Sequence, residues 1–294
     1  MFNIYQIKAY PSHLQFLFED QVTLRVHSVF KQTVNLTDGN RIYTLQHSDL
    51  PSTPLSIKIE ISRKAFENLT PIIGQEIKFN PKGCVAFGSV FEIKDAVVHE
   101  CEMKMAHVPI HAELTILYDE LTKQLFDHNG KGEMVKAAHN VITESKSSLS
   151  VFGEHMERVI NDLMISTSPL EIVHQALKLI GVGEGLTPSG DDFNCGFAAA
   201  LFYLKGIRSA DEIRQIHQLE LPKLWNTTTT ISREYLMYAH EGKFNEWVIR
   251  LFDYCQKGKD IVPTLNEIKT IGHSSGSDFL TGMYFGLRAG GKLT

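Results

Sequence analysis

The 294-residue sequence predicts an α+β protein, in which a small β-barrel or sandwich is followed by an all-α helical domain. Between about residues 14 and 100, apolar and polar residues alternate, which is typical of half-buried strands. From about residue 112 onward, the apolar residues recur with the 3.6-residue period of amphipathic helices. We therefore expect a strand-rich domain at residues 1–108 and a helical domain at residues 109–294.

The first domain is expected to contain short strands separated by turns. The alternation is clearest around Val22, Leu24 and Val26, and again in the stretch LSIKIEI at 55–61. Turn-forming residues recur between the apolar stretches, at 38–40 and again in PKG at 81–83. About six or seven short strands in this length favour a small barrel or sandwich.

The second domain is expected to consist of successive amphipathic helices. They are predicted at about residues 112–127, 132–145, 150–165, 169–180, 190–204, 226–240, 243–257 and 276–288. The helix after Ser168 has the strongest start signal, because Pro169 suits the first helical position and Glu171 completes a capping box.

Composition excludes several classes of function. A formal net charge of -5 without a Lys/Arg cluster argues against a nucleic-acid partner. The four cysteines are scattered without CxxC spacing or a paired Cys/His motif, which argues against a zinc site and a disulfide framework. The sequence shows neither a signal-peptide pattern nor an apolar run of the ~20 residues that a membrane helix needs. We therefore expect a cytoplasmic protein that binds small molecules and other proteins and contacts no membrane.

The stretch GVGEGLTPSGDDFNCGF at 181–197 is the most unusual part of the chain. Its first three glycines exceed what a single helix C-terminus needs, and a new helix is expected near Gly190. Ser189 and Asp192 fit a capping box, which would make the motif purely structural. The alternative is that the loop and the helix start hold a charged ligand, because free amides at a helix N-terminus attract anions.

A second copy of the motif favours the ligand site. Residues 275–282 repeat the pattern of residues 189–196, and both copies read S-G-x-D-F-x-x-G. Gly196 in the first copy, and Gly282 with Gly286 in the second, would let a neighbouring helix approach closely. If the two helix starts face each other, their amides, hydroxyls and carboxylates converge.

A third polar segment, NTTTTISR at 226–233, opens another predicted helix with residues that disfavour helices. Its hydroxyls and Arg233 are suited to binding a phosphate or carboxylate, which arginine contacts through two parallel hydrogen bonds. The alternative is equally open, with one hydroxyl serving as the helix cap and Arg233 as a surface charge.

These motifs define the candidate site. The candidate catalytic residues are Asp192, Asp278 and His273, the last as a proton carrier or hydrogen-bond donor. The candidate anion-binding residues are Gly185, Thr187, Ser189, Gly190, Asp191, Thr229, Thr230, Ser232, Arg233, Ser275 and Gly276. No cofactor is required, although Asp191 and Asp192 are suited to holding Mg²⁺ if the ligand is phosphorylated.

The three motifs together resemble a known family. GVGEGLTPSGDDF at 181–193, TTIS at 229–232 and GHSSG at 272–276 resemble the bacterial AllH-like family in the same order, and the likeness spans about residues 168–290. That family was long catalogued as a domain of unknown function, and it includes a subunit of oxamate carbamoyltransferase. The strand-rich half resembles the family only loosely.

The resemblance implies a carbamoyl-transfer complex of purine catabolism, in the late steps of allantoin degradation. Such a complex interconverts oxalurate and phosphate with oxamate and carbamoyl phosphate, and this chain would work beside two other kinds of subunit. The implied ligand is then carbamoyl phosphate, oxamate or oxalurate, all of them anions. In this interpretation the hydroxyl and glycine residues of the helix starts bind the anion, while Asp192 and Asp278 orient donors or a substrate amide.

Two alternatives from other classes remain open. SGDDFNCGFAAAL at 189–201 also resembles the helix start of ribokinase-like phosphotransferases, but their fold alternates strands and helices around a parallel sheet. The second alternative is a scaffold or regulatory subunit without catalytic activity, in which the helix starts bind an effector or join partner chains.

Overall fold

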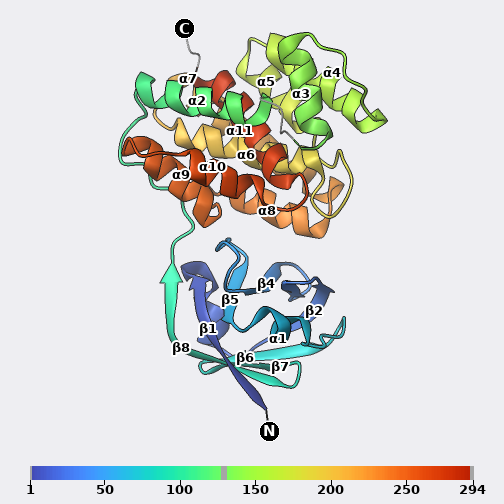
Figure 1. Cartoon of the computed structure of the whole chain (residues 1–294), viewed down its shortest axis with the longest axis vertical. Coiled ribbons are helices and arrows are strands. Elements are labelled where there is room, and N and C mark those ends of the chain that lie inside the picture. The colour runs from blue at the N-terminus through green and yellow to red at the C-terminus, as the bar shows by residue number, and fades with distance from the viewer. Residues whose placement is uncertain (1, 127–130, 292–294) are drawn as a thin grey trace. The chain divides into compact units, whose positions relative to one another are not determined.

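The computed structural model describes residues 2–126 and 131–291. The chain divides into two compact units, Met1–Cys101 and Glu102–Thr294, which are described separately here. The first is a closed, mixed β-barrel and the second is built from helices, so the predicted α+β class is confirmed (Figure 1).

The barrel of the first unit closes through its first and last strands. Its strands are β1 (Asn3–Pro11), β2 (Val22–Val29), β3 (Thr33–Thr37), β4 (Ile42–His47), β5 (Ser56–Glu60), β6 (Glu76–Asn80), β7 (Gly83–Ala86) and β8 (Ser89–His99). They follow one another around the barrel in the order β1-β5-β4-β3-β2-β6-β7-β8. The β1–β8 and β4–β5 pairs are parallel and the others are antiparallel. Short helical segments over Ser12–Phe18 and α1 (Arg63–Glu67) complete the unit.

The alternating pattern correctly identified the inward-facing side chains of the barrel. Leu24 and Val26 on β2, and Ile57 and Ile59 on β5, are all buried, as burial of alternate residues on a barrel strand requires. The pattern missed β1, because the apolar Ile4 on this strand is exposed and the alternation is therefore incomplete.

The second unit consists mainly of helices. They are α2 (His111–Phe126), α3 (Glu133–Thr143), α4 (Val151–Ile165), α5 (Pro169–Leu177), α6 (Ser189–Tyr203), α7 (Arg208–Glu220), α8 (Thr230–His240), α9 (Glu246–Gln256), α10 (Val262–Lys269) and α11 (Ser275–Gly291). The predicted capping box at Ser168 is confirmed, with Pro169 in the first turn of α5. Among the helices described, none is long and apolar enough to cross a membrane.

Two helices were not predicted, and one predicted helix starts late. α7 buries only Ala210, Ile213 and His217, so its apolar periodicity is weak in the sequence. α10 is short, with eight residues and a proline in its first turn. The helix predicted over 226–240 begins at Thr230, because the residues before it form a 3-10 helix over Leu221–Thr227.

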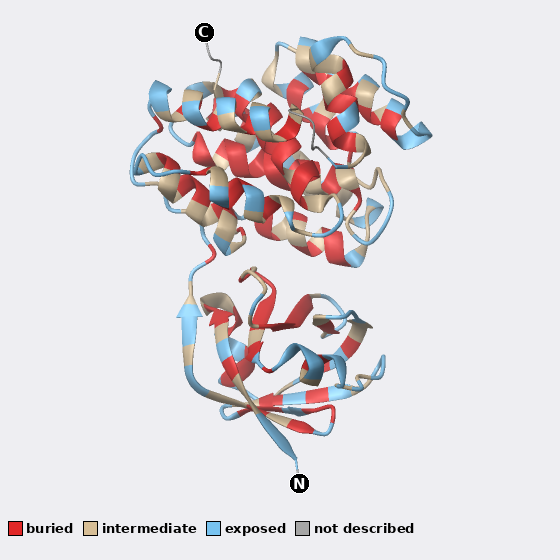
Figure 2. Ribbon diagram, in the orientation of Figure 1, coloured by how far each residue is buried: buried red, intermediate tan, exposed pale blue. Residues whose placement is uncertain are grey.

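α6 and α11 lie side by side at the centre of the helical unit and are buried along most of their length (Figures 1 and 2). Their backbones touch at glycines. A Cβ added at Gly196 would lie 1.8 Å from the carbonyl oxygen of Phe279, and one added at Gly282 would lie 1.8 Å from that of Phe193. The contact is therefore reciprocal between the two copies of the repeated motif.

Gly282→Ala is expected to lower the free energy of unfolding by about 2 kcal/mol or more, because a rigid backbone carbonyl occupies the space of the new methyl group. Gly291→Ala in the same helix is the matched control, since its added Cβ would meet no atom within 4 Å. Alanine favours helix more than glycine does, so this control should be neutral or slightly stabilising. Chemical denaturation measures both, and equal effects would show that the helix contact has no special role.

Candidate functional site

Each copy of the motif begins its helix against the end of the preceding helix. A Cβ added at Gly190 would lie 1.8 Å from the carbonyl oxygen of Leu179, just beyond α5. A Cβ added at Gly276 would lie 1.9 Å from the carbonyl oxygen of Ile268 in α10. Only glycine fits at either position. The first turns of α6 and α11 are thus placed by the same kind of backbone contact.

The capping box predicted for Ser189 and Asp192 is wrong. α6 begins at Ser189 with Pro188 in the N-cap position, and no side chain caps the helix. The Ser189 hydroxyl instead lies beside the carboxyl group of Asp278, on the other helix of the pair. The interpretation of this motif as a capping box therefore fails, because the Ser189 side chain does not form the capping hydrogen bond.

Hydroxyl and carboxyl groups cross between the two helix starts in both directions. Thr187 Oγ1 and Ser275 Oγ are hydrogen-bonded at 3.0 Å, and both hydroxyls lie beside Asp192. Asp278 in turn lies beside Ser189 and Ser274. We call these six residues the acid–hydroxyl cluster. The structure thereby confirms that the two helix starts face each other.

Both carboxyl groups of the cluster favour the protonated form. Burial raises the pKa of Asp278 to about 7, although the nearby hydroxyls of Ser189 and Ser274 act in the opposite direction. Burial also raises the pKa of Asp192 well above its usual range, and the charges of Asp278 and Asp191 add to this effect. The hydroxyls of Ser275 and Thr187 only partly offset it.

The carboxyl oxygens of the cluster are also short of hydrogen-bond partners. Asp278 is fully buried, and neither of its oxygens makes a well-aligned hydrogen bond within the described residues. Asp192 is half-buried as a residue, but its Oδ2 atom is enclosed and equally without a partner among them. Buried polar atoms without partners are costly, so they mark a position where a ligand could supply the missing hydrogen bonds.

Asp191 has a different role from its neighbour. It is fully buried, and its Oδ1 accepts the N–H of Gly181 at 2.8 Å. Its Oδ2 accepts the hydroxyls of Ser232, at 2.6 Å, and Thr228. The residue therefore ties the glycine loop and the start of α8 to the first turn of α6.

Asp191 and the residues of the cluster do not form an evident metal site. Both oxygens of Asp191 are already occupied by donors, so this carboxylate does not fit the suggested role of a Mg²⁺ ligand. Across residues 2–126 and 131–291, no group of three or more His, Cys, Asp or Glu side chains is arranged to hold a metal ion.

The third polar segment is attached to the same region. Thr229 caps α8 by accepting the N–H of Ser232 at 3.1 Å, and its hydroxyl donates to the carbonyl of Leu186 in the glycine loop. Thr230 is exposed in the first turn, and Arg233 is half-buried one residue beyond Ser232. The predicted cap is present, and Thr229 also holds the loop that precedes α6 through its bond to Leu186.

Two of the predicted amide donors are already occupied. The N–H of Gly190 donates to Val182 at 2.9 Å, and the N–H of Gly276 donates to Ile271 at 3.1 Å. Gly185 and His273 are both exposed, and Gly185 has a φ of 91°. The groups that converge at the site are therefore hydroxyls and carboxyls.

Sequence reasoning missed two residues, Ser274 and Thr228. Ser274 lies one helical turn before Asp278, a spacing that places both side chains on one face, and this signal was available in the sequence. Thr228 had no such signal, since its partner Asp191 is 37 residues away in the sequence.

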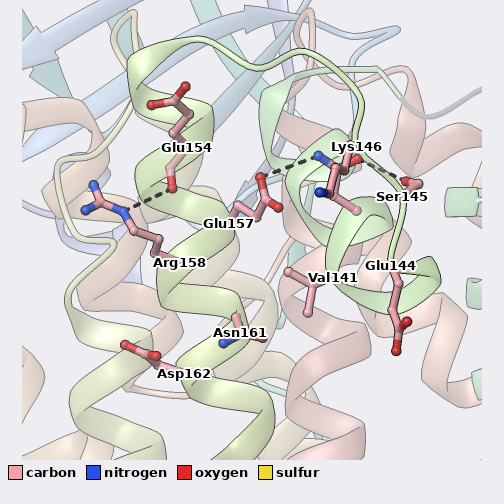
Figure 3. A pocket seen from close by; sticks show the side chains of 10 residues that line it. Val141, Glu144, Ser145, Lys146, Glu154, Glu157, Arg158, Asn161 and Asp162 are labelled. Carbon is pink, nitrogen blue, oxygen red and sulfur yellow. Dashed lines mark hydrogen bonds between the residues drawn. The ribbon is translucent and has the colours of Figure 1, made fainter.

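A separate hollow of about 860 Å³ lies between α3 and α4 (Figure 3). Its wall carries charges of both signs, including Lys146, Glu157 and Arg158. Arg158 Nε donates to the carbonyl oxygen of Glu154 in its own helix, at 3.4 Å. Most of these side chains lie at the protein surface. The hollow therefore lacks the buried carboxyl groups without hydrogen-bond partners that distinguish the acid–hydroxyl cluster.

The fold and the cluster define a two-domain protein, in which a small barrel accompanies a helical unit with a polar site where two helix starts meet. Residues 179–287 match the family described as oxamate carbamoyltransferase subunit AllH, and residues 6–98 match the AllH family N-terminal domain. The chain belongs to the AllH family of oxamate carbamoyltransferase subunits, and a subunit of such a transferase implies partner subunits. No solved structure matches the chain.

Asp191→Ala is expected to cost about 3 kcal/mol of unfolding free energy, because it leaves the buried hydroxyl of Ser232 and the partly buried donors of Gly181 and Thr228 without their acceptor. Asp253→Ala is the control, since it removes only an exposed ion pair with Lys257 and should cost less than about 0.5 kcal/mol. Denaturant titration of both variants tests this role. A cost for Asp191→Ala as small as that of the control would contradict it.

Asp278 is expected to make the protein less stable as the pH rises. Its pKa is about 7 in the folded chain against 3.8 ordinarily, so its effect on unfolding free energy changes between about pH 4 and about pH 7. Below that window the protonated group carries no penalty, and above it the penalty reaches up to about 4 kcal/mol. Relative to Asp278→Asn, the wild type should therefore lose stability across this window. Parallel pH profiles of the two proteins would refute the expectation.

Proposed function

We propose that this chain is the oxamate carbamoyltransferase subunit that holds a small carboxylate-and-amide ligand at the acid–hydroxyl cluster. The ligand class is that of oxamate, oxalurate or carbamoyl phosphate. The observation that carries the proposal is the enclosed pair Asp192 and Asp278, which faces hydroxyls from both helix starts. Within the described residues, Asp192 Oδ2 and both oxygens of Asp278 lack a well-aligned hydrogen bond. Membership of the AllH family supports this ligand class, and the matched segment 179–287 contains the whole cluster.

The cluster has the chemistry that such a ligand needs. The carboxyl groups of Asp192 and Asp278 form hydrogen bonds with an amide or ureido group, and the hydroxyls of Thr187 and Ser275 contact its oxygens. Arg233, directly after Ser232, is the cation that we assign to the ligand's carboxylate. Fixed donors of this kind orient the reactants and stabilise negative charge that develops during transfer.

In this proposal the partner subunits complete the reaction site, and the complex works in the cytoplasm in purine catabolism. No metal ion is part of the proposal. The phosphotransferase alternative loses its structural basis, because the strands of the described chain all belong to the barrel and end at His99. The experiment below distinguishes a scaffold subunit from a subunit that binds the ligand.

The test is ligand binding and carbamoyl transfer by the full chain, alone and co-expressed with its partner subunits. Oxamate, oxalurate and carbamoyl phosphate are added in thermal-shift assays, where a ligand at ~100 times its Kd adds about 2.7 kcal/mol of stability. Asp192→Ala should abolish this stabilisation and lower kcat/KM of the complex by ~100-fold or more. Asp253→Ala serves as the control and should behave like the wild type.

The scaffold alternative makes the opposite prediction. If the chain only joins its partners, no ligand stabilises it in either state, and Asp192→Ala changes assembly or nothing at all. Size-exclusion chromatography of the co-expressed complex separates this outcome from loss of binding in an intact assembly.

A further inference from the structure

We infer that Asp192 and Asp278 work as a pair that holds one proton between them, and that this pair selects a carboxamide over a second carboxylate. The neutral carboxyl group would donate to the carbonyl oxygen of the amide, while the ionised one would accept its N–H. This inference rests on the proposed function, and it goes further by assigning the protonation state and the selectivity of the site.

The arrangement of the two acids carries the inference. They occupy equivalent positions in the two copies of the motif, on helices whose backbones touch at Gly196 and Gly282. Each carboxyl group lies beside hydroxyls of the opposite copy, Ser275 for Asp192 and Ser189 for Asp278. Two like charges enclosed in one site disfavour ionisation of both, so such a pair retains a proton where single carboxyls have lost theirs.

The charged groups on the site's own helices and loop, and on the segment before α3, do not neutralise the pair. A Cβ added at Gly132 in that segment would lie 3.2 Å from Asp278 Oδ1, and the neighbouring Lys131 is exposed. Asp191 is acidic and raises the pKa of Asp192 further. Cys195, on the next turn of α6, is kept as a neutral thiol because burial raises its pKa well above the usual value. His273 is exposed before the start of α11.

Neighbouring helices hold their charged side chains in other contacts. On α10, Lys269 donates to Gln124 of α2. On α3, Glu133 accepts the N–H of Ser150 and pairs with Lys136. α2 and α7 meet α11 towards its far end, through contacts at Tyr284 and Gly290. On α8, Arg233 and the buried Glu234 also make contacts within the chain, and Arg233 is the cation assigned above to the ligand's carboxylate.

A carboxamide complements a pair with one proton. Its carbonyl oxygen accepts and its N–H donates, so each carboxyl group of the pair finds one matching partner. Oxalate has the size of oxamate but offers only acceptors, and it would leave the ionised carboxyl group facing a second negative charge. Sites built around buried hydrogen bonds reject analogues that lack the matching group by large factors.

The test compares oxamate and oxalate by isothermal titration calorimetry from about pH 6 to about pH 9, with the full chain alone and in its co-expressed complex. At pH 7 oxamate should bind ~100-fold more tightly than oxalate. At pH values above the pKa of the pair, the affinity for oxamate should fall about tenfold per pH unit, because the carboxyl group loses the proton that it donates.

Asparagine variants identify the donor and control for folding. Asparagine always offers an N–H donor, so the asparagine variant of the donating acid should keep oxamate binding and remove the loss at alkaline pH. Comparing Asp192→Asn with Asp278→Asn shows which of the two acids is the donor. Asp253→Asn on α9 should leave the wild-type profile unchanged, and thermal melts confirm that each variant is folded.

The outcomes separate the inference from the proposed function. If oxamate and oxalate bind equally, or if oxamate binding does not weaken at alkaline pH, the site stands and the one-proton pair is wrong. The same holds if both asparagine variants keep the wild-type loss at alkaline pH. If oxamate, oxalurate and carbamoyl phosphate all fail to bind at any pH, both to the chain and to the complex, the proposed function fails as well.

Discussion

The helical unit depends on one constraint, the backbone contact between α6 and α11. At Gly196 and Gly282 the missing side chains let each helix rest on a carbonyl oxygen of the other. The same motif places a glycine at the start of each helix, against the end of the helix before it. The position of each helix along its axis is therefore set at its first turn and near its middle, and the first turns of the two helices meet. The acid–hydroxyl cluster is a consequence of this packing.

Two neighbouring residues of α6, of which only Asp192 belongs to the cluster, show how packing separates structure from function. Asp191 and Asp192 are adjacent on α6, but about 100° of helical rotation turns them towards different surroundings. Asp191 meets three donors and is satisfied within the protein. Asp192 faces another acid and has an enclosed oxygen without a partner in the described chain. The first stabilises the fold, and the second lowers stability where a ligand could restore it.

Local signals in the sequence were enough to predict much of the fold, but not its pairings. The change of period from two to 3.6 identified both units, and the repeated motif identified the helices that meet. Closure of the barrel depends on the parallel β1–β8 pair, which joins the ends of the unit and has no local signature. The capping box at Ser189 failed for a similar reason, because its hydroxyl turns to Asp278 on a distant segment. Spacing predicts which residues share a face, but not which faces meet.

The repeat also makes the two halves of the cluster unequal. In a symmetric dimer of one motif, both acids would have identical surroundings and a shared proton would have no preferred side. Here both copies belong to one chain, so equivalent positions differ: Thr187 corresponds to His273, and Pro188 corresponds to Ser274. Asp278 therefore has a serine one turn before it where Asp192 has a proline. A single chain can thus make two copies of one motif unequal, so the proposed ligand would meet different side chains on its two sides.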